Sequence, residues 1–198
     1  MEQIKIFEKN ENIKRTYHKL KYQWKEDFDT IVKVNLLYEK RTLIINFDIL
    51  ENEIRKCTTH NNDKVYEDSC VECFIQIPNS DEYYNFEISA SSYMLVGRGS
   101  SRNNRFLFDD SLINKIDRKV IILDETKGSS HWLLNMSLDL EEWKLIGEKE
   151  DIKNYKLKGN FYKCGDKVSK PHYFSLFDVD SETPNFHYPP SFRELIFV

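Results

Sequence analysis

The stretch Val65-Tyr66-Glu67-Asp68-Ser69-Cys70-Val71-Glu72-Cys73-Phe74-Ile75 predicts a β-strand entered from an acidic turn. Beyond Ser69 the side chains alternate, so Val71 and Cys73 share one face of the strand and Glu72 lies on the other. The apolar face is suited to burial in a core. Tyr66, Glu67 and Asp68, which precede the strand, indicate a polar site at its beginning.

Cys70 and Cys73 form a CxxC pair, a spacing that elsewhere indicates redox or zinc chemistry. Within a strand, positions three apart point to opposite faces, so these two thiols cannot form a disulfide or share a metal. No second CxxC is present, and Cys164 is far away in sequence. We therefore expect the cysteines to be structural, packing as small hydrophobes, and we predict no metal ligands.

The composition is that of a folded globular protein, with 40% hydrophobic and 14% aromatic residues in a chain of 198. This length suits a single domain over residues 1–198. A net charge of −4 gives no electrostatic reason to expect nucleic acid as a partner. The sequence has no apolar run of about 18 residues, so we expect no membrane span.

The first residues, Met1-Glu2-Gln3-Ile4-Lys5-Ile6-Phe7-Glu8-Lys9, lack the apolar core of a signal peptide. The four cysteines show no dense disulfide spacing. A cytoplasmic location is the default expectation. A leader outside this sequence would make the protein secreted or periplasmic instead.

Short β-like segments separated by polar turns fill most of the chain. We expect strands over residues 31–38, 42–49, 70–77, 83–89, 92–97, 119–123, 132–138, 157–164, 173–177 and 193–198. The first two are separated by Glu39-Lys40-Arg41, and the next two by a polar turn, so each pair predicts a hairpin.

Helical turns are predicted only near residues 109–113 and 140–145, the second with Asp139 as its cap. Many strands without long helices between them predict an all-β fold, an antiparallel β-sandwich of jelly-roll type.

Enzymatic motifs are sparse. The five histidines show no HxH, HxxxH or HExxH spacing, and no GxSxG elbow is present. Glu72 and Glu87 would lie on adjacent strands of the second hairpin, where they could form a glycosidase carboxylate pair. A pair of strand carboxylates is more often a solvated face or a set of hydrogen-bond acceptors for a ligand.

Several aromatic motifs follow one another in a fixed order after the opening stretch. They are Tyr83-Tyr84-Asn85-Phe86-Glu87, Asn160-Phe161-Tyr162-Lys163-Cys164-Gly165-Asp166, Pro171-His172-Tyr173-Phe174-Ser175, Asn185-Phe186-His187 and Phe192-Arg193-Glu194-Leu195-Ile196-Phe197. With the opening stretch they resemble the family 9-like carbohydrate-binding proteins, a bacterial group related to the family 9 carbohydrate-binding modules of xylanases.

This resemblance implies a β-sandwich that binds a mono- or oligosaccharide without cleaving it, in carbohydrate catabolism. In the family, two aromatic rings clamp a sugar while charged and amide groups bond its hydroxyls. By motif position, Tyr66 and Tyr162 are the expected rings. The expected hydroxyl partners are Glu72, Asn85, Arg98 and Asn160.

The sequence departs from the family pattern at some positions, and other functions are compatible with its residues. Tyr66 stands where relatives usually have tryptophan, which gives less stacking area. Relatives often carry structural calcium, and Asp63, Glu67 and Asp68 offer acidic oxygens near one loop, although without EF-hand spacing. The alternatives to sugar binding are a glycoside-processing enzyme using Glu72 and Glu87, and a partner-binding sandwich that has lost its ligand.

Overall fold

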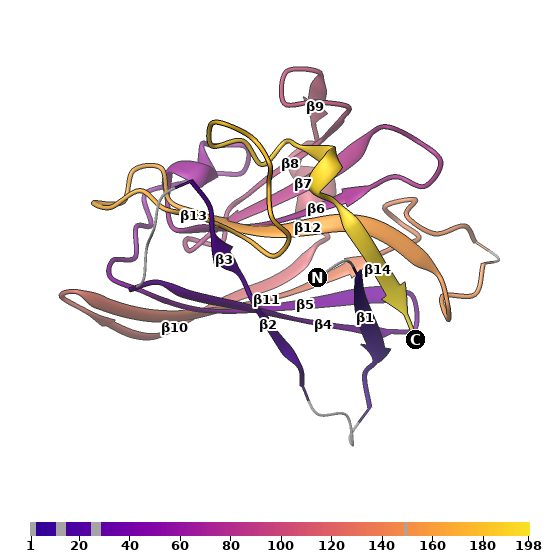
Figure 1. The fold of residues 1–198 in the computed structure, drawn as a ribbon, viewed down its shortest axis with the longest axis horizontal. Coiled ribbons are helices and arrows are strands. Elements are labelled where there is room, and N and C mark those ends of the chain that lie inside the picture. The colour runs from indigo at the N-terminus through magenta and orange to yellow at the C-terminus, as the bar shows by residue number, and fades with distance from the viewer. Residues whose placement is uncertain (1–2, 11–14, 25–28, 149) are drawn as a thin grey trace.

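The structure is a computed structural model that describes residues 3–10, 15–24, 29–148 and 150–198. Its strands form two facing layers, which are halves of one curled sheet (Figure 1). The expected β-sandwich is therefore confirmed.

We name one layer the β5 sheet. Its strands are β10 (Asp117–Thr126), β11 (Ser129–Asp139), β5 (Thr42–Glu51), β4 (Ile31–Glu39) and β2 (Tyr17–Lys19). β4 and β5 form the expected hairpin, in which Glu39 pairs with Thr42 across the turn. Lys40 has a positive φ of 55° there, as tight hairpin turns require.

The other layer is the β6 sheet. It contains β14 (Arg193–Phe197), β12 (Lys156–Cys164), β6 (Cys70–Gln76), β7 (Tyr83–Ser89), β8 (Met94–Gly99) and β9 (Arg105–Leu107), with β13 (Tyr173–Ser175) and β3 (Lys21–Tyr22) alongside β12. β6 and β7 form the second expected hairpin, with Glu72 directly opposite Glu87.

β1 (Gln3–Glu8), which the sequence analysis does not predict, joins the two layers (Figure 1). It pairs with β14 and with β4, and both pairings are parallel. The sheet is therefore mixed at this seam, in contrast to the wholly antiparallel arrangement expected from the hairpins. Ile4 and Ile6 point into the core, which anchors the strand.

The main core lies between the layers and follows the alternation along each strand. From β6 it takes Val71, Cys73 and Ile75, which pack with Phe47 and Trp132 of the β5 sheet. A second apolar cluster covers the opposite, outer face of the β6 sheet. That cluster contains Cys70, Phe74, Tyr83, Tyr162, Cys164, Phe186 and Phe192, so the segment leading into β14 folds over this face.

The helical predictions have different outcomes. α1 (Asp110–Ile113) forms as expected, and the Asp109 side chain caps it by accepting from Ser111 and Leu112 amides. Asp139 accepts in the same way from the amides of Glu141 and Glu142, but the chain makes only turns there. The expected helical turn near residues 140–145 is therefore present, closed by the Trp143 amide on the Asp139 carbonyl, but it does not extend into a helix because one capped turn does not propagate without more helical bonds.

A buried ion pair links the two layers. Lys163 of β12 lies 2.8 Å from Glu51 of β5, and both side chains are fully buried. Lys163 Nζ also donates to the carbonyl of Cys164 at 2.8 Å, and Trp132 Nε1 donates to the other oxygen of Glu51 at 2.6 Å. His172 Nε2 lies 2.8 Å from Lys163 Nζ and 3.3 Å from Glu51 Oε2.

Acid is expected to weaken the fold through Glu51. Burial alone raises the pKa of a carboxyl, but Lys163 and His172 outweigh it and lower the pKa of Glu51 from 4.5 to about 2. A lowered pKa gives stability that is present above pH 4.5 and lost as the pH falls toward 2. The loss corresponds to about 3 kcal/mol. About 2 kcal/mol of this loss falls between pH 7 and pH 3, where urea unfolding measures it. A Glu51→Gln variant should show a flatter profile, and equal profiles would contradict the assignment to Glu51.

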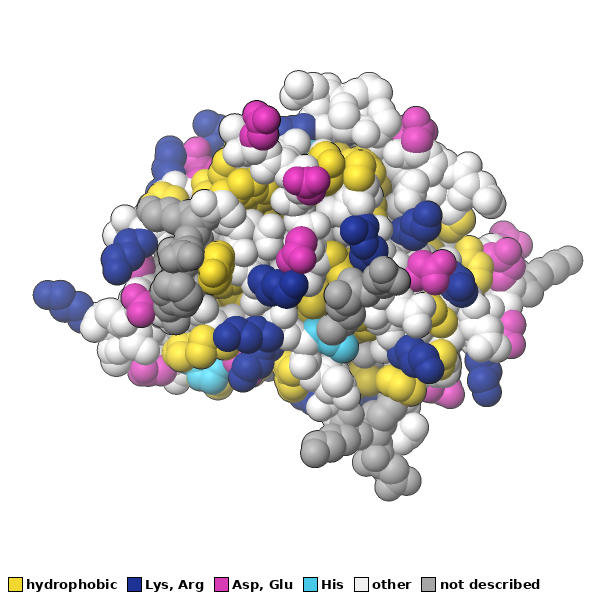
Figure 2. All heavy atoms as spheres, in the orientation of Figure 1, with side chains coloured by type: hydrophobic (Ala, Val, Ile, Leu, Met, Phe, Trp, Pro, Cys, Tyr) yellow, Lys and Arg dark blue, Asp and Glu magenta, His cyan; other side chains and the backbone are white. Residues whose placement is uncertain are grey.

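The surface carries both signs of charge. Figure 2 shows Lys and Arg side chains interspersed with Asp and Glu over one face of the molecule, without a large region of one sign. Within the described part of the chain, no helix has the length and apolar character needed to cross a membrane.

Candidate functional site

A pocket of about 90 Å³ opens on the outer face of the β6 sheet. Its floor comes from β6, β7 and β12, and its walls come from the loop before β9, the segment after β12 and residues 184–187. A volume of this size admits several water-sized groups, which suits one end of a small polar ligand.

Two carboxyls form the floor. Glu72 and Glu87 are cross-strand partners, and both are almost fully buried while lining the pocket. Burial and the neighbouring Glu87 raise the pKa of Glu72 well above its usual value. A raised pKa favours the protonated carboxyl, and in that form the group can donate as well as accept a hydrogen bond.

Glu87 has stronger polar support than Glu72. Arg105 donates to its carboxylate at 3.3 Å, and Asn85 Nδ2 donates to it at 2.8 Å. Burial raises the pKa of Glu87, while Arg105 and Asn85 oppose that rise. The floor therefore combines one carboxyl whose pKa is raised by burial with a second that a guanidinium bonds.

A histidine fixes Arg105 from the other side. Arg105 donates to His187 Nε2 at 3.2 Å, and His187 Nδ1 lies 2.8 Å from the Tyr83 hydroxyl. Arginine only donates, so Nε2 must accept and the ring proton is on Nδ1, facing Tyr83. Burial and nearby arginines lower the pKa of His187 to about 3, which keeps the ring neutral.

Aromatic rings form the walls. Tyr66, in the short helix η1 (Val65–Glu67), and Tyr173 of β13 line the pocket and are half-buried. Phe186 lines it too, and its ring stacks on Tyr162 beneath at a centroid distance of 4.3 Å. Rings with free faces beside hydrogen-bonding groups suit a ligand with both apolar C–H faces and hydroxyls.

The structure brings together Tyr66 and Glu72, two of the residues expected to bind sugar, at this pocket. Asn85 is buried beneath it and bonds Glu87. Asn160 and Tyr162 share the outer face but are fully buried, since Asn160 bonds the Phe177 carbonyl and Tyr162 lies under Phe186.

Arg98 lies elsewhere. It pairs in register with Tyr84, whose side chain is on the inner face of the β6 sheet, and it forms an ion pair with Glu82 at 2.7 Å. Arg105, one strand further on, is the arginine at the floor of the pocket.

Sequence reasoning assigned no role to Arg102, Arg105, Tyr173 or His187. His187 and Tyr173 lie in quoted motifs, and Arg105 follows a loop rich in Ser and Asn, but only the folded chain brings them to one place.

The acids considered for calcium are used otherwise. Asp68 is fully buried and accepts from the amides of Cys57 and Thr58. Glu67 pairs with Lys167 at 2.9 Å, and Asp63 accepts from the Lys64 amide. Within the described residues these three carboxylates do not come together as a ligand set.

The sequence profile of carbohydrate-binding family 9 matches residues 3–197. The chain belongs to carbohydrate-binding family 9. The match covers almost the whole sequence, so the resemblance seen in the motifs is confirmed. A search of curated proteins found no match to this family 9 protein.

Solved structures with the same fold include a candidate carbohydrate-binding protein from Bacteroides uniformis ATCC 8492. The identity is 23% and the TM-score 0.87, covering 100% of this chain and 99% of that one. A family 9 carbohydrate-binding module from Caldicellulosiruptor kristjanssonii in complex with cellotriose has 12% identity and a TM-score of 0.62, covering 98% and 93%. A second such structure from that organism, in complex with glucose, has 14% identity and a TM-score of 0.59, covering 99% and 95%.

Proposed function

We propose that this family 9 protein binds the end of a mono- or oligosaccharide in the pocket beside Glu72 and does not cleave it. The observation that supports this most directly is the juxtaposition of half-buried Tyr66 and Tyr173 with Glu72, Glu87 and Arg105. Tyrosine faces stack on sugar C–H groups, while the acids and the guanidinium bond hydroxyls in pairs.

The two carboxyls at the floor of the pocket have different roles in this binding. Glu72 lines the pocket with a carboxyl that accepts from a sugar hydroxyl and, when protonated, also donates to one. Glu87 accepts, and its bond to Arg105 fixes its orientation before the sugar arrives. Because these groups are held in place, little ordering is required on binding.

Of the two expected rings, Tyr66 lines the pocket, and Tyr173 takes the place of Tyr162 beside it. The Tyr162 ring is fully buried and supports Phe186 from below. An open pocket beside Glu72 also favours a protein that keeps a ligand over a sandwich that has lost one.

Calorimetry with glucose and cellotriose, followed by a glycan array, tests the proposal. Tyr66→Ala is expected to weaken binding about tenfold or more, because it removes a stacking face worth about 1.5 kcal/mol. Tyr93→Ala is the matched control, since Tyr93 is an exposed tyrosine that does not line the pocket. Absence of binding by the folded wild type to every saccharide on the array would refute the proposal.

A glycoside-processing activity is the second candidate, favoured by the cross-strand placement of Glu72 and Glu87 in one pocket. A neutral acid beside a carboxylate is the arrangement that glycoside hydrolysis uses. Hydrolysis of aryl glycosides by the wild type, lost in Glu72→Gln, would support it. Binding without turnover across those substrates supports the non-catalytic function.

A further inference from the structure

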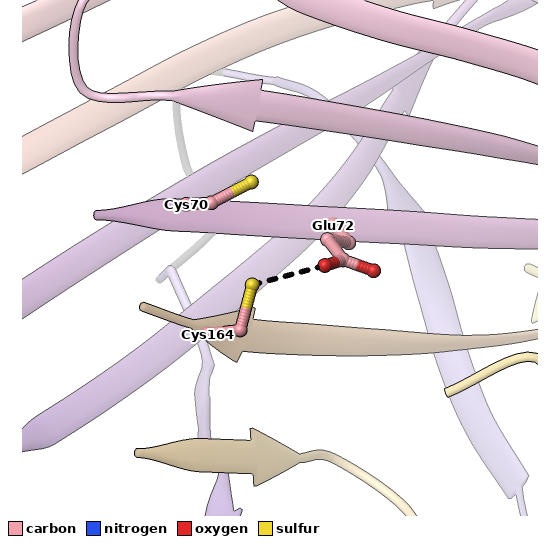
Figure 3. Close-up of side chains that lie close together, drawn as sticks. All are labelled: Cys70, Glu72 and Cys164. Atoms are coloured by element: carbon pink, nitrogen blue, oxygen red, sulfur yellow. Dashed lines mark hydrogen bonds between the residues drawn. The ribbon is translucent and has the colours of Figure 1, made fainter. Parts of the chain in front are cut away.

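Two thiols that the proposed sugar binding does not use, those of Cys70 and Cys164, lie beside Glu72 at the floor of the pocket. Cys70 begins β6 and Cys164 ends β12, and the two residues are register partners across the antiparallel pair. Glu72 is two positions along β6 from Cys70, so it is on the same face. The Cys164 thiol donates to Glu72 Oε1 at 3.1 Å (Figure 3).

These three side chains offer ligand atoms that converge. One sulfur or oxygen atom from each lies within 4.8 Å of the other two. Among the residues that the structure describes, no other group of three His, Cys, Asp or Glu side chains comes this close together. A tetrahedral zinc ion about 2.3 Å from each sulfur and about 2.0 Å from an oxygen holds its ligands about 3.5–3.8 Å apart. Small side-chain shifts are enough to reach that spacing.

Cys164, rather than the CxxC neighbour, is the partner of Cys70. Cys73 lies on the opposite face, in the core between the layers, as its place in the strand predicts. Cys70 and Cys73 point to opposite faces of one strand and cannot share a metal. Cys164 is far from Cys70 in sequence, but strand pairing places the two residues side by side on one face.

We infer that Cys70, Cys164 and Glu72 bind one soft divalent cation, zinc or cadmium, at the floor of the pocket. Two thiolates with one carboxylate favour these ions over magnesium or calcium, which prefer oxygen ligands. Glu72 and Cys164 both line the pocket, so an ion has a path to the cluster and an open coordination position on that side. As the ion binds, each thiol and the Glu72 carboxyl release a proton to solvent.

The test uses the full chain, kept reduced, and cadmium alone. Titration is expected to produce a thiolate-to-cadmium charge-transfer band that saturates at one equivalent and disappears in Cys70→Ala and Cys164→Ala. Glu72→Gln should weaken cadmium binding about tenfold or more while keeping the band. Cys73→Ala, from the same strand but the opposite face, and Cys57→Ala, an exposed cysteine, should leave both band and stoichiometry unchanged.

If a variant fails to fold, cadmium NMR on the wild type tests the site instead. The chemical shift of the bound cadmium distinguishes two sulfur ligands from one or none. Absence of the band in folded wild type with all four thiols free would overturn the inference, as would a band that survives in Cys70→Ala. The measurement involves no sugar, so its failure and the failure of sugar binding are separate results.

Discussion

Replacing Lys163 by methionine is expected to lower the free energy of unfolding by about 3–5 kcal/mol, because it leaves the carboxylate of Glu51 buried without its cation. Both side chains are fully buried, so water cannot take the place of the ammonium. Methionine has a similar volume, so the loss reports the missing charge and not a cavity. Urea unfolding at neutral pH measures it.

The matched control is Lys156→Met, on the same strand. Lys156 pairs with Glu194 at 3.1 Å, but both side chains are largely exposed, so its loss should cost under about 1 kcal/mol. The double variant Lys163→Met with Glu51→Gln should recover most of the stability, since no charge is then stranded and Trp132 keeps an acceptor. Equal losses in Lys163→Met and Lys156→Met would show that the buried pair has no special role.

Removing the Asp68 carboxylate is the second large effect, expected at about 3 kcal/mol or more for Asp68→Ala. One oxygen accepts from the Cys57 and Thr58 amides at 2.7 and 2.8 Å and from the Thr58 hydroxyl at 2.9 Å. The other pairs with Arg55. Alanine leaves these donors in a buried site without an acceptor, and thermal or urea unfolding reports the cost.

Asp68 also positions the pocket, since Tyr66 is two residues before it in the same short segment. Asp68→Ala should therefore weaken saccharide binding even below its unfolding transition. Asp63→Ala is the control, because the partly exposed Asp63 side chain accepts from the neighbouring Lys64 amide and lies 4.0 Å from exposed His60, so stability and binding should change little. A stable Asp68→Ala variant would mean that solvent satisfies those donors.

The strand pattern predicted most of the fold because burial alternates along β11 and over most of β5, whereas β6 and β7 are buried on both faces. The strand β1 was missed although Ile4 and Ile6 alternate with Gln3 and Lys5. Its partners, β14 and β4, are far away in sequence, and no hairpin turn marks the pairing. β9 was missed because three residues after a polar loop carry too little pattern.

The site was predicted only in part, because the register between distant strands and the loops that bury a side chain are set by the tertiary structure. Tyr162 pairs with Glu72 and so faces the correct side, but the segment that carries Phe186 covers it. Arg98 does not reach the pocket, because it pairs in register with Tyr84, whose side chain faces the inner core. The Cys70–Cys164 neighbourhood also depends on the register of strands that are distant in sequence.

The placement of β1 bears on how this protein avoids self-association. An unpaired strand edge is a template for another chain, and β1 occupies the edges of β14 and β4 at once. Among the described strands, this leaves β10 and the three-residue β9 at the ends of the main strand order. β10 carries charged residues at both of its ends and a register shift between Ile122 and Asp124, features that discourage edge-to-edge pairing. A chain without β1 would thus expose two further edges, and its expected failure is aggregation before any loss of the pocket.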